Sequence, residues 1–151
     1  MAGFLGEYEC RLDGKNRFML PSGLRKQLDP ACNEQFVLNR GFEGCLVLYP
    51  VNEWEKITQR LSKLNLFVAE NRKFYRQFHN GATSVGLDGS GRILIPKNLM
   101  AYAALDKDIV LFAYADRIEI WSKDRYDQVM NQDPEEFAAL AEKVMGENDQ
   151  E

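Results

Sequence analysis

The apolar and polar positions of this chain follow the same ten-residue pattern at two places, about 75 residues apart. The two stretches are LDGKNRFMLP, at residues 12–21, and LDGSGRILIP, at residues 87–96. Leu, Asp, Gly, Arg and Pro occupy the same places in both, and the three residues before each proline are apolar. A polar turn that leads into a short apolar run predicts a loop followed by a strand, and the chain carries this unit twice.

The parallel continues after each proline with a short helix and two more strands. The segments SGLRKQL and KNLMAYAAL are compatible with helices. Pro21 and Pro96 suit the first helical position, where the missing N–H costs nothing. The strands that follow are predicted at residues 36–38, 45–49, 109–114 and 117–121. Each half is therefore expected to contain a strand, a turn, a strand, a short helix, a strand, a turn and a strand.

Longer helices are predicted outside the repeated units, with apolar residues three and four apart. Asn52 is expected to cap the first, with Glu55 completing a capping box. The second lies near residues 68–78, and the third opens at residues 133–134. Their apolar stripes are Trp54, Ile57, Leu61 and Leu64; Phe74, Tyr75 and Phe78; and Phe137, Leu140, Ala141 and Val144. We expect these helices to flank a β core and to offer apolar edges to a neighbouring subunit.

The predicted fold class is α+β, mainly β. The four short strands of each half are too few to bury a core alone, so the two halves are expected to share one core. Pairing the two halves gives one pseudo-symmetric β-barrel with flanking helices. The predicted divisions are a first repeat at 5–51, a helical linker at 52–79, a second repeat at 80–123, and a C-terminal helix with an acidic tail at 124–151.

Composition places the chain among ordinary globular proteins. Of its 151 residues, 45% are hydrophobic and 28% are charged, which does not resemble a disordered chain. No window approaches the roughly 20 apolar residues that span a bilayer, and the N-terminus does not resemble a secretory signal. Cys10, Cys32 and Cys45 are odd in number and never spaced as CxxC, which favours reduced thiols in a cytosolic protein.

The charge is unevenly distributed along the chain. Residues 132–151 contain seven acids and one base, which gives this segment a net charge of −6. Because the whole chain has a net charge of −4, residues 1–131 carry +2. Between residues 11 and 26 five bases stand against a single acid. The basic density therefore coincides with the first copy of the repeat and permits a nucleic-acid partner.

The polar half of each repeat has the chemistry of a preorganised anion-binding loop. Asp13 can accept hydrogen bonds from N–H groups further along the turn, and Arg17 stands four residues on, where it can pair with Asp13. The second copy places Asp88 and Arg92 in the same way. A guanidinium held in this manner binds phosphate oxygens or the edge of guanine bidentately. Residues suited to a positive φ within the turns are Gly14, Asn16, Gly89 and Gly91. The alternative is a tight hairpin with a local ion pair and no partner.

Other chemistries fit the sequence poorly. Aligning DGSGRI with a calcium loop puts Gly86 and Lys97 where carboxylate ligands belong. His79 is the only histidine and lies at a predicted helix end, while Cys10 is expected to be a buried strand residue. A carboxylate pair of Asp13 and Asp88 would be neutralised by the two arginines. We therefore expect no catalysis, no metal and no cofactor.

Two L-D-x-x-x-R-x-x-x-P motifs about 75 residues apart, each followed by two short strands, resemble the MraZ family of bacterial transcriptional regulators, within the SpoVT-AbrB superfamily. The resemblance covers residues 4–123 and the flanking helices. It implies two tandem SpoVT-AbrB-like half-repeats that form a swapped-hairpin (double-split) β-barrel, and ring-shaped homo-oligomers. It also implies binding to short direct repeats of double-stranded DNA upstream of the division and cell-wall gene cluster, usually as a repressor, in the cytoplasm and on the nucleoid.

The resemblance assigns DNA recognition to the two loops, and hence to Asp13, Arg17, Asp88 and Arg92. The family loop usually has the form D-x-K-G-R. The first copy keeps Lys15 but has Asn16 in place of glycine, and the second has Ser90 in place of lysine. We therefore expect the first loop to be the stronger DNA contact, with Lys15 and Asn16 part of it.

Two further bases, Arg11 and Arg25, are secondary candidates for contacting DNA. The rival hypothesis is an oligomeric β-barrel that serves protein interaction or assembly without DNA. Neither hypothesis involves a membrane or a small-molecule substrate.

Overall fold

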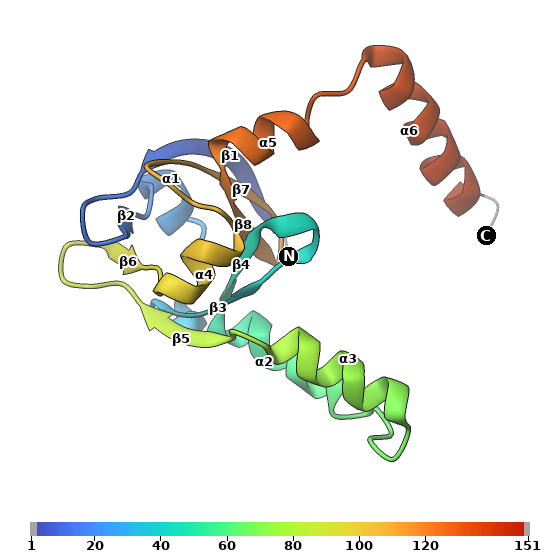
Figure 1. Ribbon diagram of the computed structural model, residues 1–151, viewed down its shortest axis with the longest axis horizontal. Coiled ribbons are helices and arrows are strands. Elements are labelled where there is room, and N and C mark those ends of the chain that lie inside the picture. Colours follow the sequence, from blue (N-terminus) through green and yellow to red (C-terminus); the bar gives the residue numbers. More distant parts are fainter. Residues whose placement is uncertain (1–2, 150–151) are drawn as a thin grey trace.

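The computed structural model describes residues 3–149 and shows a β core with peripheral helices (Figure 1). The strands are β1 (Phe4–Arg11), β2 (Arg17–Met19), β3 (Gln35–Arg40), β4 (Leu46–Pro50), β5 (Thr83–Gly86), β6 (Arg92–Leu94), β7 (Asp108–Ala115) and β8 (Arg117–Ser122). The α-helices are α1 (Ser22–Arg25), α2 (Val51–Leu61), α3 (Ala69–His79), α4 (Lys97–Tyr102), α5 (Lys123–Val129) and α6 (Pro134–Asp149). Two short 3₁₀ turns are η1 (Pro30–Cys32) and η2 (Phe42–Gly44).

The order of elements confirms the predicted duplication. The first half contains β1, β2, α1, β3 and β4, and the second contains β5, β6, α4, β7 and β8 in the same sequence. The fold class is α+β, mainly β, as predicted, and the strand pairs are antiparallel. Helix α5 was not anticipated, so the segment after residue 123 holds two helices where the sequence predicts one.

The two halves exchange strands. Six strands form one antiparallel sheet in the order β1-β7-β8-β4-β3-β5, and β2 pairs with β6 in a separate two-stranded ribbon. Strand β1 therefore pairs with β7 of the other half, and β5 pairs with β3. Within residues 3–149 the sheet ends at β1 and β5, so closure into a swapped-hairpin barrel stays a prediction.

The core is built from equivalent residues of the two repeats. Phe18 and Ile93 face each other across the ribbon and are at most 1% exposed. Leu24 of α1 and its counterpart Leu99 of α4 are fully buried beside them. Burying such side chains removes apolar surface from water, which is the main favourable contribution to folding. The ribbon is thereby anchored to the sheet through its inner face.

A second apolar cluster contains the aromatic residues near the ends of the two central strands, β4 and β8. Tyr49, Trp121 and Tyr126 are buried in it, and Trp54 of α2 packs against it. The rings of Tyr49 and Trp54 lie 5.5 Å apart, and those of Trp121 and Tyr126 lie 6.2 Å apart. The aromatic pair that follows each second strand thus fastens a helix to the sheet.

The structure corrects three predicted helix starts. Pro21 and Pro96 occupy the N-cap of α1 and α4, one residue before the first helical position. Asn52 does not cap α2 either, because Pro50 takes the N-cap and the helix begins at Val51. The Pro50 ring holds φ at −55° while its ψ of 144° remains extended, so the chain turns into the helix before Asn52 is reached. The Asn52 side chain is therefore inside the first turn, and its capping box with Glu55 does not form.

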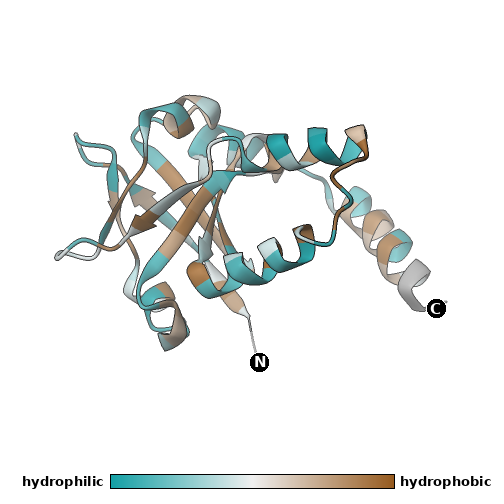
Figure 2. Ribbon diagram, turned by 90° about the horizontal axis from the view of Figure 1, so that it is seen from below, coloured by the Kyte–Doolittle hydropathy of each residue, from teal (hydrophilic) through white to brown (hydrophobic). Residues whose placement is uncertain are grey.

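Helices α2 and α3 form a hairpin that extends from the sheet, away from the β2–β6 ribbon (Figure 1). The loop that joins them is apolar at its tip (Figure 2), with Phe67 95% exposed. The predicted C-terminal helix, α6, leaves its apolar stripe exposed at Phe137, Leu140 and Val144. Among the described residues, none of the helices combines the length and the hydropathy that crossing a membrane requires.

Candidate nucleic-acid interface

The two Asp-x-x-x-Arg loops lie together at one end of the molecule, where they connect to β2 and β6 (Figure 1). Each loop is a tight turn closed by backbone hydrogen bonds. The N–H of Asp13 donates to Arg17 O at 2.8 Å, and the N–H of Asp88 donates to Arg92 O at 3.0 Å. The turns are near-copies of each other, as the repeated sequence predicts.

Each aspartate holds its arginine in the predicted way. The Asp13 carboxylate accepts hydrogen bonds from the N–H groups of Lys15 and Arg17, at 2.9 and 3.0 Å. Its second oxygen accepts from Nε of Arg17 at 2.9 Å. Asp88 makes the same three contacts, with Ser90 N, Arg92 N and Arg92 Nε, at 2.9, 2.9 and 3.0 Å. Because only Nε is engaged by the aspartate of the same loop, the terminal guanidinium nitrogens remain available for other acceptors.

The turns need a left-handed residue at one place only, immediately before the arginine. Asn16 has φ of 60° and Gly91 has φ of 80°, as predicted. Gly14 and Gly89 are equally suited to a positive φ, but neither adopts one. Asn16 therefore adopts in the first loop the left-handed conformation that Gly91 adopts in the second.

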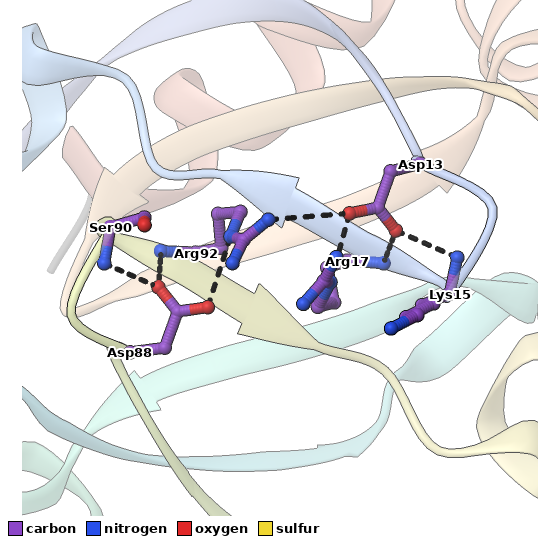
Figure 3. A network of polar contacts seen from close by, with 6 residues as sticks. All are labelled: Asp13, Lys15, Arg17, Asp88, Ser90 and Arg92. Carbon is purple, nitrogen blue, oxygen red and sulfur yellow. Dashed lines mark hydrogen bonds and ion pairs between the residues drawn. The ribbon is translucent and has the colours of Figure 1, made fainter.

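The two loops are also joined to each other. Figure 3 shows Arg17 and Arg92 lying between the two aspartates, with Nη1 of Arg92 3.9 Å from Oδ2 of Asp13. The backbone adds reciprocal hydrogen bonds, from Leu20 N to Gly91 O at 3.0 Å and from Ile95 N to Asn16 O at 2.9 Å. The aspartates thus face arginines, which fits a role in orienting guanidinium groups and not the carboxylate pair of an acid–base catalyst.

These contacts keep both aspartates ionised. Partial desolvation opposes ionisation of Asp13, but hydrogen bonds from the backbone N–H groups of Arg17 and Lys15 and from the Arg17 side chain outweigh it. The pKa of Asp13 is therefore lowered from its ordinary value of 3.8. For Asp88 the backbone N–H of Arg92 is the largest cause, and it lowers the pKa against a smaller effect of desolvation. Both carboxylates carry full charge near neutral pH.

Arg25 belongs to the first repeat but lies beside the second loop. A Cβ atom at Gly91 would be 3.0 Å from Nη1 of Arg25. The Arg25 side chain is held there by Glu34, whose Oε2 accepts from Nε at 2.8 Å. The second loop lacks a lysine at Ser90, and the first repeat supplies a cation to it. Because Arg25 is itself paired with Glu34, the expectation that the first loop is the stronger DNA contact stays a prediction.

The remaining predicted bases differ in their surroundings. Lys15 is exposed, and in Figure 3 its backbone N–H is joined to Asp13 while its side chain has no marked contact with the network. Arg11 is paired with Asp108 at 3.1 Å across the β1–β7 pair, and its side chain is 77% exposed. Arg25 is thus brought to a loop by the fold, whereas Arg11 is engaged on the sheet.

The family model described as "MraZ protein, putative antitoxin-like" matches the chain twice, over residues 3–77 and 78–148. The chain belongs to the MraZ family. Proteins named "Transcriptional regulator MraZ" are similar to it over nearly their whole length. The one from Christiangramia forsetii is 44% identical over 150 residues, which are 99% of this chain and 97% of the relative. Those from Flavobacterium psychrophilum and Cytophaga hutchinsonii are 46% and 47% identical, covering 100% and 96% of this chain and 98% and 96% of the relatives.

Two other residues with reactive side chains, His79 and Cys10, lie in structural surroundings of this MraZ-family chain. Nδ1 of His79 lies 2.9 Å from Tyr75 O, and the ring stacks on Tyr75 at 4.2 Å, which ties the end of α3 together. Cys10 is half-buried in β1, not fully buried as predicted, because β1 is an edge strand of the sheet. Burial raises the pKa of its thiol, which leaves less of the reactive thiolate.

Two kinds of residue at this MraZ-family site escaped the sequence-based prediction. Glu34 positions Arg25 from a loop nine residues away, and no short-range pattern connects them. Met19 and Leu94 share the outer face of the ribbon with the two arginines. The period of two along a strand is the signal that identifies them, since residues 17 and 19 must point the same way.

The lowered pKa values of Asp13 and Asp88 predict a pH-dependent stability. A carboxylate whose pKa is lower in the folded state stabilises the fold above its unfolded pKa, near 3.8, and loses this contribution as the pH falls through the folded value. The Asp13→Asn/Asp88→Asn variant is thus expected to melt below the wild type at pH 7, with the difference shrinking below about pH 4. Thermal denaturation from pH 2 to 7 measures it. A constant difference at every pH would contradict the prediction, and the exposed Asp106→Asn serves as the control.

Proposed function

We propose that this MraZ-family regulator is a sequence-specific DNA-binding repressor that uses the β2–β6 ribbon and its two loops. The observation that carries the proposal is the pair of arginines, each fixed by an aspartate, side by side on one projecting ribbon. Arg17 and Arg92 contact DNA, while Asp13 and Asp88 orient them. Asn16 shapes the first turn.

The remaining bases extend this interface. Lys15 contacts a phosphate or a base beside the first loop, and Arg25 is its counterpart beside the second. Arg11 is a secondary contact that would have to leave Asp108 to reach DNA.

The two-stranded form of the ribbon and its fixed arginines support this function. The major groove of B-DNA admits a two-stranded β-ribbon, and arginine is the side chain that binds the O6 and N7 atoms of guanine bidentately. With Nε engaged by aspartate, the guanidinium plane is held in one direction before DNA arrives. This preorganisation reduces the conformational entropy lost on binding.

Several subunits are needed for tight binding, because one chain offers few cations. Each neutralised phosphate contributes only about −0.9 to the slope of log affinity against log salt. In a ring-shaped homo-oligomer, neighbouring subunits present their ribbons to successive direct repeats, and effective concentration multiplies the weak individual contacts. The exposed apolar residues of α6 offer a surface for such assembly. The proposed target is the promoter of the division and cell-wall gene cluster, and the proposed location is the nucleoid in the cytoplasm.

A gel shift on the DNA upstream of the protein's own operon tests the proposal. We expect a shift that weakens with rising salt and that an unlabelled duplex of the same sequence removes better than a shuffled one. Equal competition by both duplexes would overturn sequence specificity.

The rival function is an assembly module that binds proteins through its apolar surfaces. It is favoured by the exposure of Phe67 at the tip of the helical hairpin and of Phe137 on α6, which are 95% and 63% exposed. Exposed apolar patches commonly mark protein contacts. Complete absence of salt-sensitive binding to the upstream DNA would favour this function.

A further inference from the structure

The outer face of the β2–β6 ribbon combines two arginines with two apolar residues. In the antiparallel register Arg17 is opposite Leu94, and Met19 is opposite Arg92. Phe18 and Ile93, between them, point inward and are buried. The outward face is therefore a four-residue checkerboard of two guanidinium groups and two apolar side chains.

The two apolar residues are exposed to the same extent. Met19 and Leu94 are each 53% exposed, although each stands directly across the ribbon from an arginine. A Cβ atom at Gly91 would lie 3.5 Å from Sδ of Met19, so Met19 lies against the second loop instead of extending freely into solvent. Polar residues at these two places would serve a purely solvated ribbon equally well, so the apolar pair calls for an occupant that is both anionic and partly apolar.

We propose that Met19 and Leu94 are specificity-determining residues that contact the 5-methyl groups of thymines next to the guanines bound by Arg17 and Arg92. This inference rests on the proposed DNA-binding function. In the major groove the thymine methyl is the one apolar group among the base edges, and side chains recognise it by apolar contact. Duplex DNA is therefore an occupant that offers both the negative charge and the methyl group.

The spacing of the checkerboard suits adjacent base pairs. Residues directly opposite in an antiparallel pair have Cβ atoms roughly 4.5–5.5 Å apart. Successive bases along one strand are separated by about 3.4 Å. An arginine and its apolar partner across the ribbon thus cover neighbouring steps, and the two pairs are related by the pseudo-two-fold of the repeat. Each pair would recognise a guanine with a thymine beside it.

Charge argues against a second copy of this chain as the occupant. The bases Arg17, Arg92, Lys15 and Arg25 outnumber the acids Asp13, Asp88 and Glu34 that hold three of them, and the guanidinium groups lie on the outer face, so two copies docked through this face would oppose net positive charge. The face complements a polyanion, and the apolar pair then adds a contact that the phosphate backbone does not provide.

The test compares thymine with deoxyuridine, which lacks only the 5-methyl group. A duplex from the upstream promoter is prepared with each thymine replaced singly, and affinity is measured by fluorescence anisotropy. For the wild type we expect a loss of about fourfold at one or more thymines adjacent to guanine, the value of one buried methyl group. For Met19→Ala/Leu94→Ala we expect weaker binding to the thymine duplex and no further loss with deoxyuridine. Met130→Ala is the control, because Met130 is 54% exposed at the C-cap of α5, outside the ribbon.

The possible outcomes separate this inference from the function on which it rests. Equal affinity of the wild type for every thymine and deoxyuridine duplex would overturn the methyl contact and leave DNA binding intact. Absence of binding to either duplex would overturn both. Sedimentation velocity of Met19→Ala/Leu94→Ala completes the test: an unchanged oligomer is expected, and dissociation would assign the face to a second copy and overturn the proposal.

Discussion

Replacing Arg17 and Arg92 together by alanine is expected to weaken binding to the upstream DNA by at least about 30-fold. A bidentate contact from arginine to a base contributes roughly 1–3 kcal/mol, and the lower bound for two such contacts gives this factor. The loss includes the conformational advantage of guanidinium groups already held by Asp13 and Asp88. Fluorescence anisotropy on the assembled variant measures it, with Arg60→Ala on α2 as a control that removes one arginine from elsewhere on the surface. Undiminished affinity would contradict the site assignment.

The Arg17→Lys/Arg92→Lys variant separates charge from geometry. Lysine keeps the positive charge but cannot form the planar bidentate contact. We expect this variant to retain a salt-sensitive affinity for DNA while losing the preference for the promoter over a shuffled duplex. Full retention of that preference would show that the arginines act only on phosphates.

Replacing Phe18 by alanine is expected to lower the free energy of unfolding by about 3–5 kcal/mol. Phe18 is 1% exposed and packs in the main core, so its loss combines the transfer of an aromatic ring with a cavity that the ribbon cannot close. For a chain of this length the change corresponds to a fall in melting temperature of roughly 6–20 °C. Thermal and urea denaturation measure the effect.

Met19→Ala is the matched control for this substitution. Met19 is the next residue along the strand and points outward, so its truncation should change stability by no more than about 0.5 kcal/mol. Similar losses for Phe18→Ala and Met19→Ala would contradict the assignment of inner and outer faces to the ribbon. The contrast also distinguishes a residue that holds the site in place from one that belongs to its surface.

The local sequence was sufficient to predict most of the helices and strands and the contacts within each Asp–Arg loop. The four-residue spacing of Asp13 and Arg17 allows a turn in which the carboxylate reaches both the backbone and the guanidinium, and both copies form it. The strands of each half were located to within a few residues because their apolar runs are bounded by turns. The error at Asn52 arose because two residues were suited to precede the helix: Asn52 as a side-chain cap, and Pro50 as a residue with fixed φ. The extended ψ of Pro50 decided the start of the helix.

The contacts between the repeats depend on the tertiary structure and could not be predicted from spacing. The exchange of β1 and β5 between the halves brings the loops together, and only then does Arg92 reach Asp13. The position of Arg25 beside Gly91 has the same origin. The buried Asn39 is a further example: its amide donates to Phe78 O at 2.7 Å, which attaches the end of α3 to β3 across 39 residues of sequence.

In the proposed complex with DNA, the inequality of the two loops would give the ribbon a direction along the duplex. A ribbon with identical halves would dock equally well after a half-turn about its pseudo-two-fold, and its preferred target would be a palindrome. Here one side carries Lys15 on its own loop, and the other carries Arg25, which is braced by Glu34. The two orientations on a groove therefore differ in free energy, so each protomer has a preferred polarity. In the proposed ring, subunits that all point the same way would match target sites that are repeated without inversion.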